Sequence, residues 1–220
     1  PDHTTHDVDL LVESQKTREA IALLASRAHQ QGWRLARLQS RLGIHKLLLV
    51  SDNATQGTMQ CLLLLDLWWG NGLWRGVPAT WSEAVLRTTN LHAGFRVASP
   101  GAEAAVTLAK EYLHSGELGP VDKLARNRDR VARGVQTDRA AFIETLDLGF
   151  GQRLANEIAD HIASGDWNWF TRHIRQVRAR VMARSLLRQP AAQIIAWARF
   201  LFGHFSDRVI HPSGLFVCLI

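Results

Sequence analysis

The spacing of apolar residues changes once along this chain, near Ser99, and that change constrains the fold more than any single motif. Before it, short apolar runs rich in Leu and Val are typical of strands, with one amphipathic helical segment after the first run. After the Ser99-Pro100 pair, which is a helix-starting signal, every periodic segment is helical. We therefore predict an α+β fold, with a mixed sheet and flanking helices over residues 1–98 and an all-helical domain over 99–210.

The apolar and turn-forming residues also set approximate element boundaries. Turn formers between Ser51 and Gly57 predict that the two strands beside them form a hairpin. The expected strands span 7–12, 33–38, 45–51 and 58–67, and the expected helices span 17–31, 101–114, 120–134, 137–147, 150–164, 167–188 and 190–204.

The first expected strand, DVDLLV, carries two aspartates one residue apart. Successive strand residues alternate between faces, so Asp7 and Asp9 point the same way, while Val8, Leu10 and Val12 line the opposite face. Burying an ionised carboxylate inside a strand costs roughly several kcal/mol of folding free energy unless a partner compensates the charge. The pair therefore needs a cationic partner.

A third carboxylate, Asp66, closes the apolar run MQCLLLLDL. If the two strands are neighbours, Asp7, Asp9 and Asp66 converge at one end of the sheet, and oxygen-preferring Mg²⁺ ions are the natural partner. Three other interpretations stay open: Asp7 as a strand cap, Asp9 as the partner of an arginine, and Asp66 as the first residue of a turn.

Together these residues resemble the nucleotidyltransferase fold of the DNA polymerase β superfamily: the strand DVDLLV, a helix, and a later strand bearing one Asp. The resemblance implies that Asp7 and Asp9 are the metal-binding pair, that Asp66 is the third ligand or proton acceptor, and that two Mg²⁺ ions carry an NTP substrate. The Gly-Ser turn of that family is absent from the residues before Asp7. A catalytically silent module that senses nucleotide or docks a partner is therefore the alternative function.

A narrower resemblance covers nearly the whole length, through DVDLLV, HKLLLV, LLLLDLWWGNGLWRGVPA, SGDWNWF and HPSGLFVCLI. This layout looks like bacterial two-domain proteins with a nucleotidyltransferase-like half and a thymidylate-kinase-like half. It implies that residues 211–220 form the first strand of a P-loop kinase-like domain outside this sequence, which would dock on the helical region. Any kinase activity would belong to that half.

A nucleotidyl transfer also needs cations near the triphosphate. Lys110 is the first candidate, followed by Lys123 and Arg128, with Arg126 beside them. The alternative for the last three is a solvated helix face with ion pairs between helical turns. The tryptophans of DLWWGNGLW (Trp68, Trp69 and Trp74) form either a loop that stacks on a base or ordinary aromatic packing.

The segment 167–188 is expected to form an amphipathic helix, and it contains six arginines and no acidic residue. We expect Ile174, Val177 and Val181 to form its buried stripe, and Trp167 and Trp169 to anchor its packing. The arginines form a docking face for the kinase-like half, an ordinary exposed face, or a nucleic-acid or membrane-surface patch. The last is the least favoured because no groove-reading motif accompanies them.

Composition limits the partners and the compartment. The 26 Lys and Arg against 20 Asp and Glu give a net charge of +6, which suits anionic partners such as nucleotides. Cys61 and Cys218 lie in apolar runs, so we expect no disulfide framework and a cytoplasmic location. The chain has no uninterrupted apolar run of about twenty residues, so we expect no membrane span.

Overall fold

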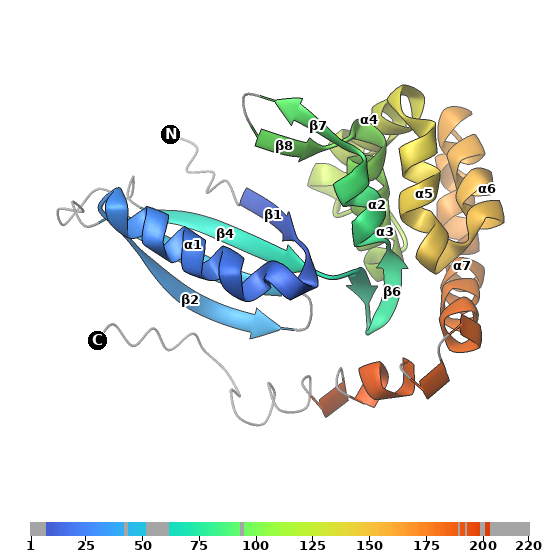
Figure 1. The fold of residues 1–220 in the computed structure, drawn as a ribbon. Helices are drawn as coiled ribbons and strands as arrows, with labels where there is room; N and C mark the ends of the chain where they lie inside the picture. Colours follow the sequence, from blue (N-terminus) through green and yellow to red (C-terminus); the bar gives the residue numbers. More distant parts are fainter. Residues whose placement is uncertain are drawn as a thin grey trace. The chain divides into compact units, whose positions relative to one another are not determined.

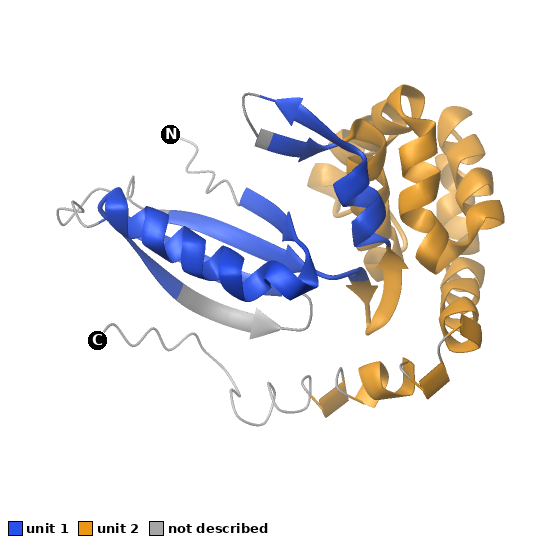
Figure 2. Ribbon diagram, in the orientation of Figure 1, with its two compact units in different colours: residues 1–72, 81–98 blue, residues 73–80, 99–220 orange. Residues whose placement is uncertain are grey.

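The computed structural model of this protein describes residues 8–41, 44–51, 62–92, 95–188, 190–191, 193–198 and 201–202, with the side chains of 37–41, 62 and 95 excepted. The described chain divides into two compact units (Figure 2). Unit 1 comprises residues 1–72 and 81–98, and unit 2 comprises residues 73–80 and 99–220. Residues 73–80 thus belong to the same unit as the helices that follow Ser99.

Unit 1 is built on a four-stranded mixed sheet with the strand order β1-β4-β3-β2 (Figure 1). Its strands are β1 (Val8–Val12), β2 (Trp33–Arg41), β3 (Ile44–Ser51) and β4 (Leu62–Trp69). β1 runs parallel to β4, whereas the β2–β3 and β3–β4 pairs are antiparallel. The predicted mixed α+β architecture is confirmed, and so is the antiparallel pairing of the two strands on either side of residues 51–57.

Helix α1 (Thr17–Gln30) follows the 3-10 turn Ser14–Lys16 and covers one face of this sheet (Figure 1). Ile21 and Leu24, one helical turn apart, pack against the buried leucines Leu47, Leu65 and Leu67. Leu10 and Val12 join the same cluster. The alternation predicted for the first strand therefore holds for Leu10 and Val12, which pack in the core under α1, whereas Val8 is exposed.

Unit 1 also contains a short helix, α2 (Ser82–Arg87), and a two-stranded hairpin of β7 (Thr89–His92) and β8 (Phe95–Ala98). The sequence pattern did not predict these three elements. Each has only four to six residues, and three of the four residues of β7 are exposed. Neither a helical nor an alternating apolar pattern can develop over such lengths.

Unit 2 begins with the small two-stranded sheet of β5 (Gly72–Trp74) and β6 (Val77–Thr80) and continues with a set of helices. The helices are α3 (Pro100–Ser115), α4 (Val121–Thr137), α5 (Arg139–Phe150), α6 (Gln152–Ala163) and α7 (Trp167–Arg188). All five match predicted helices within a few residues. Further helical residues lie within the predicted segment 190–204.

Local sequence explains the helix boundaries in unit 2. Ser99 caps α3 by accepting a hydrogen bond from the Ala102 N–H, and Gly116 ends the helix in the left-handed conformation at φ 87°. Asp138 separates α4 from α5 and caps the latter by accepting from the Ala141 N–H.

One continuous core holds unit 2 together, and it includes Trp74, Val77 and Ala79 from the small sheet. Tyr112 is fully buried, and its hydroxyl donates to the Phe170 carbonyl at 2.8 Å. Trp169 is buried in this core and Trp167 packs against it, so the predicted anchoring role of both tryptophans is confirmed. The stripe of Ile174, Val177 and Val181 also packs there, as predicted.

Candidate functional site

The face of the sheet opposite α1 brings two of the predicted carboxylates together. Asp9 on β1 and Asp66 on β4 are direct register partners in a parallel pair. Neighbouring strands lie about 4.8 Å apart, and partners in register share a face. Lys46 on β3 is the register partner of Asp66 from the other side, and Trp68 follows Asp66 on the same face. We call Asp9, Lys46, Asp66 and Trp68 the acidic face.

Asp66 is the buried member of this group. It lies inside β4, the strand between β1 and β3, and only 7% of its surface is exposed. The Lys46 ammonium donates to Asp66 Oδ2 at 3.3 Å. Asp66 Oδ1 is also buried but has no hydrogen-bond partner in the part of the chain that the structure describes. A buried carboxylate oxygen in that state can bind a cation or a proton donor.

Asp9 is the accessible member. Its side chain is exposed, and the Trp68 indole Nε1–H donates to Asp9 Oδ1 at 2.8 Å. This hydrogen bond comes from the neighbouring strand and fixes one carboxylate oxygen beside Asp66. The acidic face thus combines one solvent-facing carboxylate, one buried carboxylate and one ammonium group.

Two predictions about these residues are corrected. Asp66 does not end its strand, because β4 continues to Trp69, so the interpretation of Asp66 as a turn residue is wrong. Trp68 and Trp69 belong to β4 and not to a loop. Trp69 stacks on His45 at a centroid distance of 6.1 Å. Trp74 is buried in the core of unit 2, so packing accounts for it rather than a base-stacking loop.

Some predicted residues lie outside the described residues. Asp7 is one of them, so the convergence of all three carboxylates stays a prediction. Cys61, Cys218 and the predicted strand 211–220 are also outside them. Within the described part of the chain, no group of three or more His, Cys, Asp or Glu side chains is arranged to hold a metal ion.

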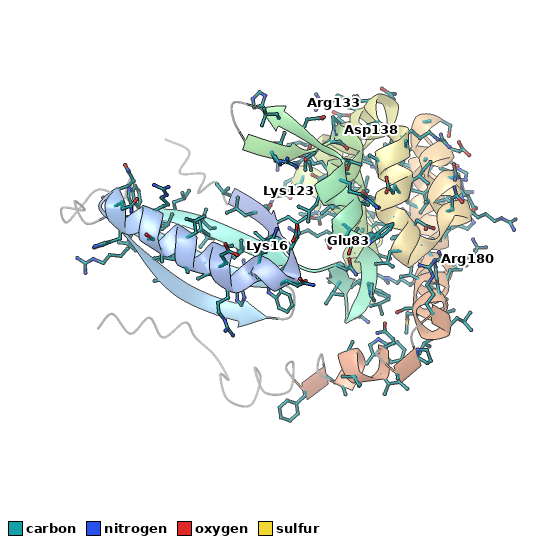
Figure 3. All side chains as sticks on the ribbon, in the orientation of Figure 1. Lys16, Glu83, Lys123, Arg133, Asp138 and Arg180 are labelled. Atoms are coloured by element: carbon teal, nitrogen blue, oxygen red, sulfur yellow. The ribbon has the colours of Figure 1, made fainter. Side chains whose placement is uncertain are left out.

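The three predicted triphosphate-binding cations belong to unit 2. Lys110 is exposed on α3. Lys123, which is labelled in Figure 3, is exposed on α4. The Arg128 guanidinium lies over the Trp167 ring, 5.5 Å from its centroid, which gives it a packing role in this unit. Because Asp9 and Asp66 belong to unit 1, the contribution of these cations to the same site stays a prediction.

Two arginines of α7 bond to the ends of other helices. Arg178 donates to the carbonyls of Leu113 and His114 at the end of α3, both at 2.9 Å. Arg184 donates to the Leu148 carbonyl and to Asp147 near the end of α5, both at 3.3 Å. These bonds satisfy carbonyls that a helix end leaves unpaired. Part of the arginine-rich helix therefore serves the packing of unit 2.

Sequence reasoning missed Lys46 as a member of the site, and it considered Trp68 for base stacking but not as the hydrogen-bond donor to Asp9. Lys46 is the one charged residue of IHKLLLVS, and its alternation places it opposite Leu47 and Leu49. That was the available signal, because a lysine within a half-buried strand usually has an acidic partner. Its pairing with Asp66 depends on the β3–β4 register, which the sequence does not fix.

No family model, curated protein or solved structure matches this chain. In the described residues, no helix is both long enough and apolar enough to cross a membrane.

Proposed function

We propose that this chain carries a nucleotidyltransferase-like module that binds an NTP with Mg²⁺ on the acidic face. The pairing of Asp9 with Asp66 on adjacent parallel strands supports this proposal most directly. The resemblance of DVDLLV and its following elements to the DNA polymerase β superfamily supplies the reaction class. In it, an acceptor hydroxyl or phosphate attacks the α-phosphate of the NTP and pyrophosphate leaves.

The residues present are compatible with Mg²⁺. Carboxylate oxygens are the ligands that this ion prefers, and Asp66 Oδ1, which has no hydrogen-bond partner in the described part of the chain, can accept a cation or a donor. Asp9 and Asp66 would hold the ion, with Asp7 as the third ligand that the resemblance predicts. When bound, Mg²⁺ would neutralise triphosphate charge and favour ionisation of the attacking hydroxyl.

The chain's own residues have separable tasks in this proposal. The Trp68 indole orients the Asp9 carboxylate. Asp66 Oδ1 is the atom to which the acceptor hydroxyl would lose its proton if Asp66 acts as a base. Lys46 offsets the negative charge of Asp66 while no ligand is bound. Lys110, Lys123 and Arg128 stay predictions as triphosphate-binding residues.

Titration calorimetry of the whole chain with each of the four ribonucleoside triphosphates tests the proposal. We expect binding that requires Mg²⁺ and that Asp66→Asn and Asp9→Asn each weaken by about tenfold or more, because each removes a negative oxygen ligand. Glu144→Gln, which removes a carboxylate in unit 2, is the matched control. Binding without Mg²⁺, or binding that Asp66→Asn leaves unchanged, would contradict the proposal.

The Lys46–Asp66 ion pair favours the second candidate function, a catalytically silent module that senses nucleotide or docks a kinase-like domain on the helical region. An ammonium group at a carboxylate can stand where a metal ion would otherwise bind. In Lys46→Met, a metal-binding module gains a large Mg²⁺-dependent rise in Tm, since Mg²⁺ replaces the lost charge. A silent module is equally destabilised with and without Mg²⁺.

A further inference from the structure

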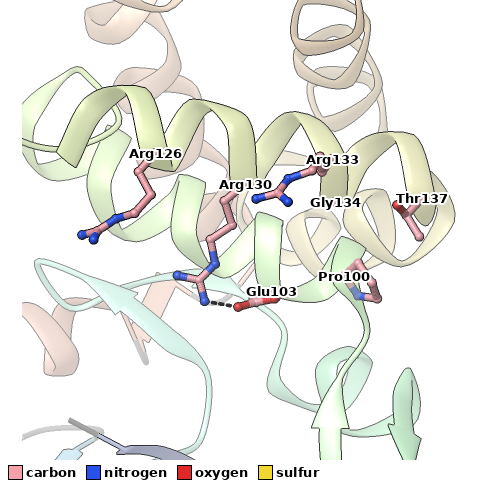
Figure 4. Close-up of a pocket in the computed structure, with 7 residues that line it drawn as sticks. All are labelled: Pro100, Glu103, Arg126, Arg130, Arg133, Gly134 and Thr137. Atoms are coloured by element: carbon pink, nitrogen blue, oxygen red, sulfur yellow. Dashed lines mark hydrogen bonds and ion pairs between the residues drawn. The ribbon is translucent and has the colours of Figure 1, made fainter. Parts of the chain in front are cut away.

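A second charged feature lies within unit 2, in a groove between α3 and α4. The groove has a volume of about 490 Å³, within the range of ligand sites. Its lining includes three arginines of α4, Arg126, Arg130 and Arg133, and one acid, Glu103 of α3 (Figure 4). We call the groove lined by Arg126, Arg130 and Arg133 the arginine groove. Three guanidinium groups against one carboxylate leave it with a net positive charge.

The helix geometry sets the spacing of these cations. Positions 126, 130 and 133 lie on one face of α4, and they rise along the axis by about 6 Å and then about 4.5 Å, at about 1.5 Å per residue. Figure 4 shows the Arg126 guanidinium apart from that of Arg130, along the same side of the helix. A row of guanidinium groups matches a linear chain of anionic groups better than a single anion.

The contacts of the three arginines leave room for a ligand. Arg130 pairs with Glu103, and Arg133 Nε donates to the Asp129 carbonyl of its own helix at 3.4 Å. Arg126 is exposed and has no ion pair within the described residues. The side chains of Arg130 and Glu103 are about half exposed, at 50% and 44%. An ion pair this exposed is weak, so a ligand can displace it.

Close helix packing holds the groove in shape. Gly134 lies against α3 so tightly that a Cβ there would come within 2.4 Å of the Pro100 carbonyl oxygen. At the start of α3, Pro100 has no N–H, and the N–H groups of Ala102 and Glu103 already bond to Ser99. Recognition in the groove therefore rests on guanidinium groups and not on the helix N-terminus.

We propose that the arginine groove binds a polyphosphate chain, with the guanidinium groups paired to successive phosphates. Guanidinium groups form bidentate bonds with phosphate oxygens, and no aromatic side chain among the described residues lines the groove to read a base. The site goes beyond the proposed function, because it uses neither the acidic face nor Mg²⁺. Its ligand is the triphosphate tail of a nucleotide or an inorganic polyphosphate.

The test is titration calorimetry of the whole chain with inorganic tripolyphosphate in EDTA, which removes any binding through Mg²⁺. We expect saturable binding that weakens as salt rises. The triple variant Arg126→Gln/Arg130→Gln/Arg133→Gln should lower the affinity by about tenfold or more, and the corresponding Lys variant by less, because lysine keeps the charge but loses the bidentate geometry.

The α7 helix provides a matched control, Arg172→Gln/Arg175→Gln/Arg180→Gln. Arg172 Nε donates to the Asn168 carbonyl of its own helix, Arg180 pairs with Glu157, and Arg175 is exposed. Arg172 also pairs with Asp166 at 3.7 Å, so the control removes the same charges and at least as many contacts. This control should leave the affinity within about twofold of the parent chain, since the charges that change do not line the groove and are screened by salt. Equal losses in both triple variants would overturn the proposal.

Three further arms complete the experiment. Asp66→Asn should leave the binding of tripolyphosphate in EDTA unchanged, because Asp66 does not line the groove. The proposed function and the arginine groove can therefore fail independently of each other. No tripolyphosphate binding, or orthophosphate binding of equal strength, would overturn the proposal. Equal affinity for ATP and tripolyphosphate assigns the nucleotide tail as ligand, whereas clearly tighter binding of longer inorganic chains assigns inorganic polyphosphate. Thermal unfolding of each variant verifies that it is folded.

Discussion

The two units treat their buried polar groups differently. In unit 2, the Tyr112 hydroxyl donates to the Phe170 carbonyl and the Asn127 amide to the Leu118 carbonyl. The buried groups there that lack a partner within the described residues are neutral, namely the Thr145 hydroxyl and the Trp74 indole. In the described part of unit 1, the buried atoms without a hydrogen-bond partner are the Trp69 indole nitrogen, which is neutral, and a carboxylate oxygen of Asp66. A buried carboxylate whose hydrogen bonds are incomplete costs more free energy than a buried neutral group in the same state, even though Lys46 pairs with the other Asp66 oxygen. A ligand that bonds to Asp66 Oδ1 would therefore recover more free energy than one that bonds to a neutral group of unit 2.

The units also differ in the extent of their cores. The core of unit 1 centres on three buried leucines of β3 and β4, and the apolar residues around them are only partly buried. The core of unit 2 draws buried residues from every helix between α3 and α7 and from the small sheet. We therefore expect the helical unit to carry most of the conformational stability of the chain.

Matched leucine truncations test this difference, and they should have the largest effect. Leu146 in unit 2 and Leu67 in unit 1 are both fully buried. We expect Leu146→Ala to lower the free energy of unfolding by about 4 kcal/mol and Leu67→Ala by about 2–3 kcal/mol, because the partly exposed neighbours of Leu67 can relax into the space. Urea unfolding measures both. Equal losses would show that the two cores are equally well packed.

Removing a helix-capping arginine should have the next largest effect. Arg178→Met deletes two hydrogen bonds to the end of α3 and leaves those carbonyls without a donor, so we expect a loss of about 1–3 kcal/mol. Arg175→Met, on the exposed side of the same helix, should change stability by less than about 0.5 kcal/mol. Similar effects from both variants would refute the capping role.

Replacing the Lys46–Asp66 ion pair of unit 1 with apolar residues tests whether this pair stabilises the fold. The double variant Lys46→Met/Asp66→Leu exchanges a partly buried ion pair for apolar side chains, and we expect it to raise the free energy of unfolding by about 1 kcal/mol. Lys46→Met alone should lower it by about 1 kcal/mol, a discounted value because Lys46 is 39% exposed. A double variant less stable than the parent would mean that the pair supports the fold.

The smallest expected effect is a pH dependence from unit 2. Partial burial lowers the pKa of the His114 imidazole below the ordinary 6.5, and the nearby positive charge of Arg75 lowers it further. The unfolded chain then binds a proton more readily than the folded chain. Stability should be full above pH 6.5 and fall as the pH drops toward the lower folded pKa. His114→Gln should flatten this part of the stability curve in urea titrations at several pH values. An unchanged slope would contradict the assignment.

Local pattern predicted much of this molecule. The alternation of Leu10 and Val12 placed Asp9 on the opposite face of β1, and the Ser99-Pro100 signal placed the start of α3. These features depend on residues close together in the chain. The helices of unit 2 were predictable for the same reason, since their apolar stripes extend over three or more turns.

Long-range pairing was the part that local pattern could not supply. The ion pair of Lys46 with Asp66 arises from strand register, and the caps of Arg178 and Arg184 arise from helix packing. The inclusion of Trp74 in the helical core is likewise tertiary. In the candidate site, sequence therefore identified the carboxylates but not the groups that orient and neutralise them.

The membership of residues 73–80 in the helical core has a practical consequence. The backbone passes from one unit to the other three times, after residues 72, 80 and 98, and so a single protease cut cannot release either unit intact. A recombinant fragment that starts at Ser99 would lack Trp74, Val77 and Ala79, leaving a hole in its interior. Dissection of this protein into independent pieces calls for circular permutation or a grafted hairpin, not truncation.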